Sequence, residues 1–289
     1  MKTAWVLRGG ASFGAVQVGA ARALLEAGHH PDLLYGTSAG ALNAAWLAAD
    51  PTLAGLASLA ALWVQAKSRD LFPLRPLTAI SGVVGLSDHT VSSAGLAAWL
   101  RTTSLLRRLE DGVLPLVVVA TDIQTGEAVL LESGPAVPAL LASSAMPGVF
   151  PPVRIGGRWL MDGSIASDTP IGPAVQAGTT RAWVLPSVPV GPMPRPRTAL
   201  DALLRSSAIM LARHNAAIIG TWSSSCELYV VPAPFVPGVS PFRFDKSAQL
   251  IDAAYRATSS WLRQAHPVGA AALGDDNDKA KLQGSEASL

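Results

Sequence analysis

The sequence lacks the side chains on which several classes of protein depend. Its single cysteine, Cys226, excludes an internal disulfide and any cysteine-cluster metal site. Its five histidines show no spacing typical of metal ligands: His29, His30, His89, His214 and His266. The glycine-lysine-serine or glycine-lysine-threonine signature of a P-loop is missing as well. We therefore expect no metal and no cofactor.

Charge and long apolar runs are also scarce. Charged residues make up 15% of the 289 residues and the formal net charge is +2, so nothing indicates a nucleic-acid partner. No apolar stretch approaches the ~20 residues that a transmembrane helix needs. The first apolar run, residues 4–7, ends at Arg8 and is too short for a signal peptide. We expect a cytoplasmic protein or one peripheral to a membrane.

Short apolar segments are abundant, and they alternate with helical patterns. Strands are predicted at residues 4–7, 32–35, 116–121, 182–185 and 228–231, with helices between them, among others at 39–49, 53–66 and 198–220. Continuously apolar strands are typical of a mostly parallel sheet with helices on both faces, which is a three-layer α/β/α fold. We expect one domain over residues 1–273 and a polar, disordered tail over residues 274–289.

A serine flanked by glycines stands at one of these strand-to-helix junctions. The segment Gly36-Thr37-Ser38-Ala39-Gly40 follows an apolar strand and precedes a helix. This arrangement is a nucleophile elbow, in which Gly36 and Gly40 keep side chains out of a tight turn and the serine hydroxyl is held at a helix N-terminus. The alternative is a glycine-rich turn without catalytic function.

A nucleophilic serine needs a base, and the sequence offers an aspartate in preference to a histidine. None of the histidines after Ser38 lies in a short loop after a strand, where a Ser–His–Asp triad would place its base. Asp162 ends an apolar strand and precedes Gly163, at the edge where open α/β sheets carry functional groups. In a dry site its pKa would rise toward that of a useful base. The alternative is that Asp162 caps a turn, because Asp-Gly is a common turn signal.

A glycine-rich turn at residues 8–14 offers backbone amides for an oxyanion hole. A dinucleotide loop is the rival interpretation, but that motif requires glycine where this chain has Ala11.

These three motifs, in this order, resemble the patatin-like phospholipase family. The likeness extends over residues 4–190 and is carried by "LRGGASFGAVQVGAARALLEAG", "YGTSAGALNA", "VATDIQTGEAVLL" and "LLASSAMPGVFPPVRIGGRWLMDGSIASDTPIGPAVQAG". The resemblance implies a patatin-like fold and a Ser38–Asp162 dyad that forms an acyl-enzyme. It further implies an oxyanion hole made by Gly10 and Ala11, with Gly9 as a further donor.

The chain departs from the family pattern at three positions. Ala11 replaces a glycine, which costs about 1 kcal/mol if that position needs a positive φ. Phe13 stands where the family often has a lysine or arginine, which favours a neutral ester over a phosphate head group, and only Arg8 offers a substitute charge. Ser164 follows Asp-Gly where alanine or glycine is usual.

An apolar segment at residues 71–86, rich in proline and glycine, is unusual for a loop. It is either a flap over an acyl site or a segment packed on the sheet. The residues that we expect to meet the lipid chain, in a pocket or flap, are Phe13, Phe72, Leu74 and Leu77.

The sequence as a whole predicts a serine esterase or lipid acyl hydrolase that cleaves carboxylic esters, with an ester or lipid substrate and possible contact with a membrane or micelle. Two alternatives remain open at this point. One is a phospholipase A or lysophospholipase that acts on membrane phospholipid. The other is a non-catalytic lipid-binding scaffold, which the altered oxyanion loop makes conceivable.

Overall fold

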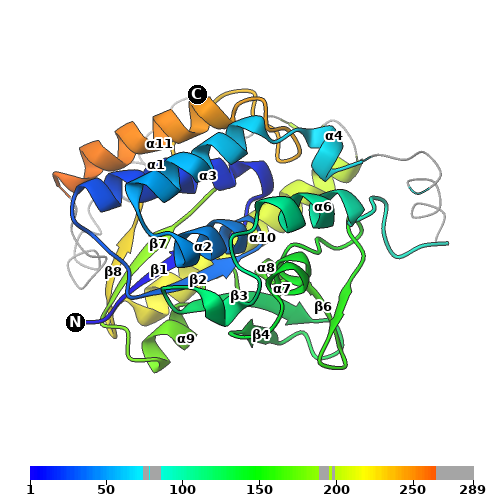
Figure 1. The fold of residues 1–289 in the computed structure, drawn as a ribbon, viewed down its shortest axis with the longest axis horizontal. Coiled ribbons are helices and arrows are strands. Elements are labelled where there is room, and N and C mark those ends of the chain that lie inside the picture. The colour runs from blue at the N-terminus through cyan, green and yellow to red at the C-terminus, as the bar shows by residue number, and fades with distance from the viewer. Residues whose placement is uncertain (74–77, 79–85, 189–194, 197–198, 265–289) are drawn as a thin grey trace, which may run out of the picture.

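A computed structural model describes residues 1–73, 78, 86–188, 195–196 and 199–264 (Figure 1). Within these residues the strands form one eight-stranded sheet. The strands are β1 (Thr3–Leu7), β2 (Leu33–Thr37), β3 (Leu116–Asp122), β4 (Ala128–Leu131), β5 (Val153–Ile155), β6 (Arg158–Asp162), β7 (Arg181–Leu185) and β8 (Glu227–Val230). The predicted helix at residues 39–49 matches the observed one, and the predicted strands differ from the observed ones by at most two residues at either end.

Helices cover the sheet. In chain order they are η1 (Ala11–Gly14), α1 (Ala15–Glu26), α2 (Ala39–Ala49), α3 (Leu53–Gln65), α4 (Ser68–Leu71), α6 (Ala94–Thr103), η2 (Leu109–Asp111), α7 (Ala136–Ser143), α8 (Ser164–Ser167), α9 (Ile171–Gln176), α10 (Ala199–Trp222) and α11 (Ser247–Leu262). Figure 1 shows α1, α3 and α11 running side by side in one layer.

The alternation of side chains along β1 shows why both faces of the sheet are covered. Trp5 and Leu7 belong to a core cluster that includes side chains of α1, α2, α3 and α11. Ala4 and Val6 point the other way, into a cluster with side chains of α9 and α10. A strand that is buried on both faces needs an uninterrupted apolar sequence, as the sequence analysis assumed. The three-layer α/β/α fold is therefore confirmed.

The parallel part of the sheet has the order β3-β2-β1-β7-β8, and β4 and β6 run antiparallel to β3. Ala120 of β3 pairs with β4 on one edge and with Asp162 of β6 on the other. The preceding residue, Val119, pairs with Thr37 of β2 on that second edge. The carboxyl ends of β2 and β6 thus meet along one edge of β3, which brings the end of each strand next to the other.

Several segments that the sequence analysis singled out lie outside the described residues. Leu74, Leu77 and most of the segment 71–86 lie outside the described residues, and so does the tail at residues 274–289. Among the helices of the described part, none combines the length and the apolar character that a membrane span requires.

Candidate active site

Ser38 lies between β2 and α2 with φ 54° and ψ −125°, a conformation that a residue with a side chain adopts only when its surroundings force it. The flanking glycines explain the constraint. A Cβ at Gly40 would lie 2.1 Å from the backbone oxygen of Leu7, and one at Gly36 would lie 2.5 Å from the Cα of Ala41. The turn is therefore as tight as the sequence predicts. Ser38 is buried, with 7% of its surface exposed.

A second serine, which sequence reasoning missed, supports this turn. The backbone N–H of Ser38 donates to the Oγ of Ser143 at the end of α7, at 2.8 Å. The hydroxyl of Ser143 in turn donates to the backbone oxygen of Val119, at 2.5 Å. Ser143 thereby ties the elbow to β3, the strand along which β2 and β6 meet. No local sequence signal distinguishes Ser143 from its neighbour Ser144.

Asp162 lies within hydrogen-bond distance of Ser38. The Ser38 hydroxyl donates to Oδ2 of Asp162 at 2.7 Å, while Oδ1 accepts from the N–H and the hydroxyl of Ser164 at 2.9 and 2.6 Å. Burial raises the pKa of the Asp162 carboxyl, and the hydrogen bonds from Ser164 and Ser38 offset part of this rise. A carboxylate of raised pKa is a stronger proton acceptor than one in water. Ser164, a departure from the family pattern, orients this carboxylate.

The glycine-rich turn faces the elbow from the end of β1. Ala11 has φ 48°, so the cost of placing alanine at this position is real. Within the described residues, the backbone N–H groups of Gly10 and Ala11 have no hydrogen-bond acceptor. The N–H of Gly9, in contrast, donates to Oδ1 of Asp168 at 2.7 Å. Because this bond occupies the Gly9 amide, only the amides of Gly10 and Ala11, of the three expected oxyanion donors, lack an acceptor within the described residues.

Asp168 is the second residue that sequence reasoning missed. Its carboxylate is fully buried and accepts from Arg8 Nε at 2.7 Å and from Asn215 Nδ2 at 2.9 Å, in addition to the Gly9 amide. The sequence "SDTP" gives no hint of this role, because the partners lie far away along the chain. Arg8 is therefore engaged in an ion pair with Asp168 and does not substitute for the cation that the family often carries at Phe13.

An apolar pocket of about 50 Å³ opens beside Ser38. The described residues that line it include Ala11, Phe72, Phe150 and Phe244, together with Ser38 itself. Phe72 stacks on Phe150 and Phe244, with ring centroids 5.2 and 6.2 Å apart. Phe72 thus lies in the wall of this pocket, and its contact with a lipid chain stays a prediction. Phe13 is not among the lining residues and packs against the core instead.

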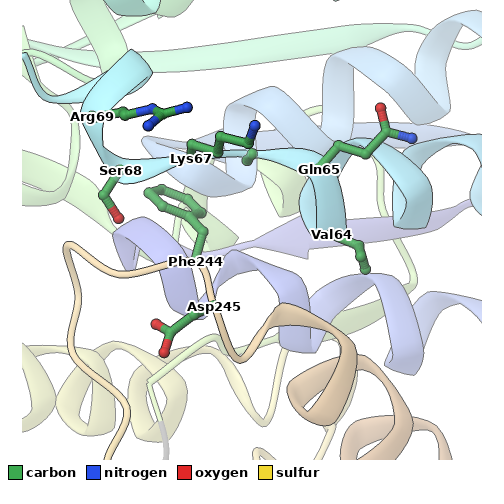
Figure 2. A pocket seen from close by; sticks show the side chains of 8 residues that line it. Val64, Gln65, Lys67, Ser68, Arg69, Phe244 and Asp245 are labelled. Atoms are coloured by element: carbon green, nitrogen blue, oxygen red, sulfur yellow. The ribbon is translucent and has the colours of Figure 1, made fainter.

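A more open cleft of about 710 Å³ adjoins this pocket, and the two share Ala66 and Phe244. Figure 2 shows Phe244 between the segment that joins α3 to α4 and the side chain of Asp245. Lys67 and Arg69 bring two cationic groups to this cleft. Arg69 lies 3.6 Å from Asp70, whereas no carboxylate within the described residues pairs with Lys67.

No cluster of three or more His, Cys, Asp or Glu side chains with the arrangement of a metal site exists in the part of the chain that the structure describes.

Comparison with known proteins identifies a family and several relatives. The family model described as "Patatin-like phospholipase" matches residues 5–175. An uncharacterized NTE family protein of Mycobacterium tuberculosis is 35% identical over 121 residues, which are 38% of this chain and 33% of that protein. Patatin-like phospholipase domain-containing protein 7 of Rattus norvegicus is 29% identical over 190 residues, which are 65% of this chain and 13% of that protein. This chain thus spans about a third or less of the length of these relatives.

Among solved structures, VipD of Legionella pneumophila aligns with a TM-score of 0.46 and 14% identity, covering 91% of this chain and 67% of that one.

Proposed function

Because this chain belongs to the patatin-like phospholipase family, we propose that it is a serine esterase or lipid acyl hydrolase that uses a Ser38–Asp162 dyad. The observation that carries the proposal is the 2.7 Å hydrogen bond from the Ser38 hydroxyl to the Asp162 carboxylate. A serine hydroxyl attacks an ester only if a base removes its proton, and a hydrogen bond to a buried carboxylate supplies that base.

The first half of the proposed reaction acylates the serine. Oγ of Ser38 attacks the ester carbonyl while its proton moves to Oδ2 of Asp162. The N–H groups of Gly10 and Ala11 stabilise the negative charge that develops on the carbonyl oxygen. The bond from the carbonyl carbon to the alkoxy oxygen then breaks, and the alcohol leaves with the proton held by Asp162. The product of this half is an acyl ester on Ser38.

The second half releases the acid. Asp162 takes a proton from a water molecule, which attacks the acyl-enzyme carbonyl, and the same two amides stabilise the oxyanion. The carboxylic acid leaves and Asp162 returns the proton to Ser38. No step requires a histidine.

The size of the apolar pocket bears on the acyl group. The volume beside Ser38 is only about 50 Å³, and the rings of Phe72, Phe150 and Phe244 line it, so we propose that these rings limit the length of the acyl chain. We expect short p-nitrophenyl esters to be hydrolysed with the higher kcat/KM. We expect Phe244→Ala to shift the preference toward longer acyl chains.

The decisive experiment is labelling with a fluorophosphonate, which reacts with activated serines. The parent protein should be labelled at Ser38 and should hydrolyse p-nitrophenyl esters. Ser38→Ala should lose both, and Asp162→Asn should lose most of both. Ser206→Ala, an exposed serine on α10, is the matched control and should keep the parental rate. Parental activity in both dyad variants would refute the dyad, and an unlabelled Ser38 would favour a non-catalytic lipid-binding protein.

A second candidate, a phospholipase A or lysophospholipase, is favoured by one observation. The cleft beside the acyl pocket carries Lys67 and Arg69, whose charges suit an anionic head group. Fatty-acid release from vesicles tests this candidate, with phosphatidylglycerol as the anionic lipid and phosphatidylcholine as the zwitterionic one. Release from phosphatidylglycerol that falls in Lys67→Ala would support it. Hydrolysis of soluble esters only would argue against a phospholipase and favour a simple esterase.

A further inference from the structure

Ser144 is a buried hydroxyl without a partner, and it lies in the wall of the pocket beside Ser38. It follows the last residue of α7, and 8% of its surface is exposed. Its Oγ has no hydrogen-bond partner within the described residues. A hydroxyl that is removed from water without a partner destabilises the folded protein, and for this reason such groups are rare. The unpartnered hydroxyl of Ser144 therefore needs an explanation.

The neighbouring serine, in contrast, uses its hydroxyl to support the fold. Ser143 donates to the backbone of β3 and accepts from the backbone of Ser38, so its role is structural. Ser144 makes neither contact. Among the described residues that line the pocket, Ser38 and Ser144 carry hydroxyl groups, and the others are aliphatic, aromatic or methionine side chains. Of these two hydroxyls, that of Ser38 donates to Asp162, so the hydroxyl of Ser144 is the one that is free to bind a ligand.

The chemistry of an ester indicates what Ser144 binds. An ester has two oxygens and no donor, so a pocket hydroxyl binds it only by donating. This inference rests on the proposed reaction, in which the carbonyl oxygen of the ester accepts hydrogen bonds from the amides of Gly10 and Ala11. The alkoxy oxygen is then the acceptor that remains.

We propose that Ser144 is a substrate-binding residue whose hydroxyl donates a hydrogen bond to the alkoxy oxygen of an ester bound at Ser38. The bond strengthens as that oxygen gains negative charge and leaves. The preferred substrate class is accordingly the oxygen ester. A thioester presents sulfur at the same place, and sulfur is a weak acceptor.

The test compares Ser144→Ala with a control that removes an equivalent hydroxyl elsewhere. Thr258 on α11 is also buried, and its Oγ1 also lacks a partner, but it does not line the pocket. Ser144→Ala and Thr258→Val should both unfold at a temperature no lower than the parent, because each loses an unsatisfied hydroxyl. Only Ser144→Ala should lose activity. We expect its kcat/KM to fall about tenfold for an oxygen ester, and clearly less for the thioester with the same acyl group.

The outcomes separate this inference from the proposed function. If the parent is labelled by the fluorophosphonate and Ser144→Ala hydrolyses the oxygen ester at the parental rate, the inference is wrong and the proposed function stands. An equal fall for ester and thioester, or a lower unfolding temperature, would show that Ser144 is structural and would also overturn the inference. A parent protein that is neither labelled nor active would overturn both.

Discussion

Two neighbouring strands end in turns that hold a non-glycine residue at positive φ, but they hold it for different reasons. Ser38 at the end of β2 has φ 54° and Ala11 beyond the end of β1 has φ 48°. In the proposed reaction the strain at Ser38 directs a side chain toward the substrate. Ala11 has only a methyl group, so the strain there directs its backbone N–H. In this proposal a positive φ serves the nucleophile in one turn and an oxyanion donor in the other.

The two turns are also stabilised by different forces. Close packing holds the elbow, since Gly40 leaves no room for even one carbon atom beside Leu7. A buried ion pair holds the glycine-rich turn, because Asp168 binds both Arg8 and the Gly9 amide. Packing is short-ranged and tolerates no added volume, whereas a buried ion pair tolerates no loss of either partner. Mutations can separate these two kinds of support.

The largest effect is expected from the ion pair. Asp168→Asn leaves the partly buried Arg8 without its counter-charge, and it should lower the free energy of unfolding by about 3–5 kcal/mol. The matched control is Asp252→Asn, whose exposed pair with Arg256 should contribute less than about 1 kcal/mol. Urea denaturation measures both. A loss for Asp168→Asn no greater than that for the control would show that the turn does not depend on this charge.

Overpacking of the elbow should rank next. Gly40→Ala forces a Cβ against the Leu7 carbonyl, so we expect a loss of about 3 kcal/mol together with the loss of fluorophosphonate labelling at Ser38. Gly220→Ala on α10 is the control, because a Cβ there meets nothing within 4 Å. That variant should gain about 0.5–1 kcal/mol from the higher helix propensity of alanine. Normal labelling of Gly40→Ala would show that the elbow tolerates a shift.

The next prediction concerns how the activity at the elbow depends on pH. Asp162 must be ionised to accept the serine proton, and burial raises its pKa. As the pH falls through this raised pKa, kcat/KM should fall about tenfold per pH unit, with a midpoint above the range of an exposed aspartate. A profile of kcat/KM against pH measures the midpoint. A midpoint in the range of an exposed aspartate would contradict the proposed base.

The raised pKa of Asp162 also determines how its ionisation affects the stability of the folded protein. A carboxyl whose pKa is raised in the folded state contributes stability at low pH, and this contribution is lost as the pH rises through the folded pKa. The ionised Asp162 is then a net cost at neutral pH. Asp162→Asn should therefore be at least as stable as the parent at neutral pH while losing activity, and urea denaturation checks this.

The smallest effect is expected at Ala11. Ala11→Gly relieves the cost of a positive φ, about 1–2 kcal/mol, but the unfolded chain gains about 0.4–1 kcal/mol of conformational freedom. The net gain in the free energy of unfolding should be about 1 kcal/mol or less, with kcat/KM unchanged. Ser38→Gly should give a similar change in stability and no activity. A large loss of activity in Ala11→Gly would mean that the methyl group itself contributes.

The sequence allowed much of this architecture to be predicted because the signals were local. Continuous apolar strands predicted a sheet covered on both faces. The glycines around Ser38 and the strand end at Asp162 predicted two residues that the structure brings into contact. Their catalytic roles remain a proposal. The order of the strands, and the meeting of β2 and β6, arises from pairing over long distances in the chain.

The residues that hold the two turns in place could not be predicted, because their partners are also distant in the sequence. Asp168 and its partner Arg8 are 160 residues apart, and Ser143 and Ser38 are 105 residues apart. A buried aspartate and a buried serine look like ordinary loop or helix-end residues until their partners are known. The hydrogen bond of the Gly9 amide could not be predicted either, because its acceptor lies in a distant segment.

The meeting of β2 and β6 on one edge of β3 also determines when the site is assembled during biosynthesis. The elbow and its serine leave the ribosome before the carboxylate that contacts the serine, which is 124 residues further along the chain. Contacts of such long range are slow to form, because a large loop must close first. A nascent or truncated chain that ends before β6 carries the serine without its partner. Under the proposed mechanism, such a chain is inert toward esters until the β5–β6 hairpin has docked.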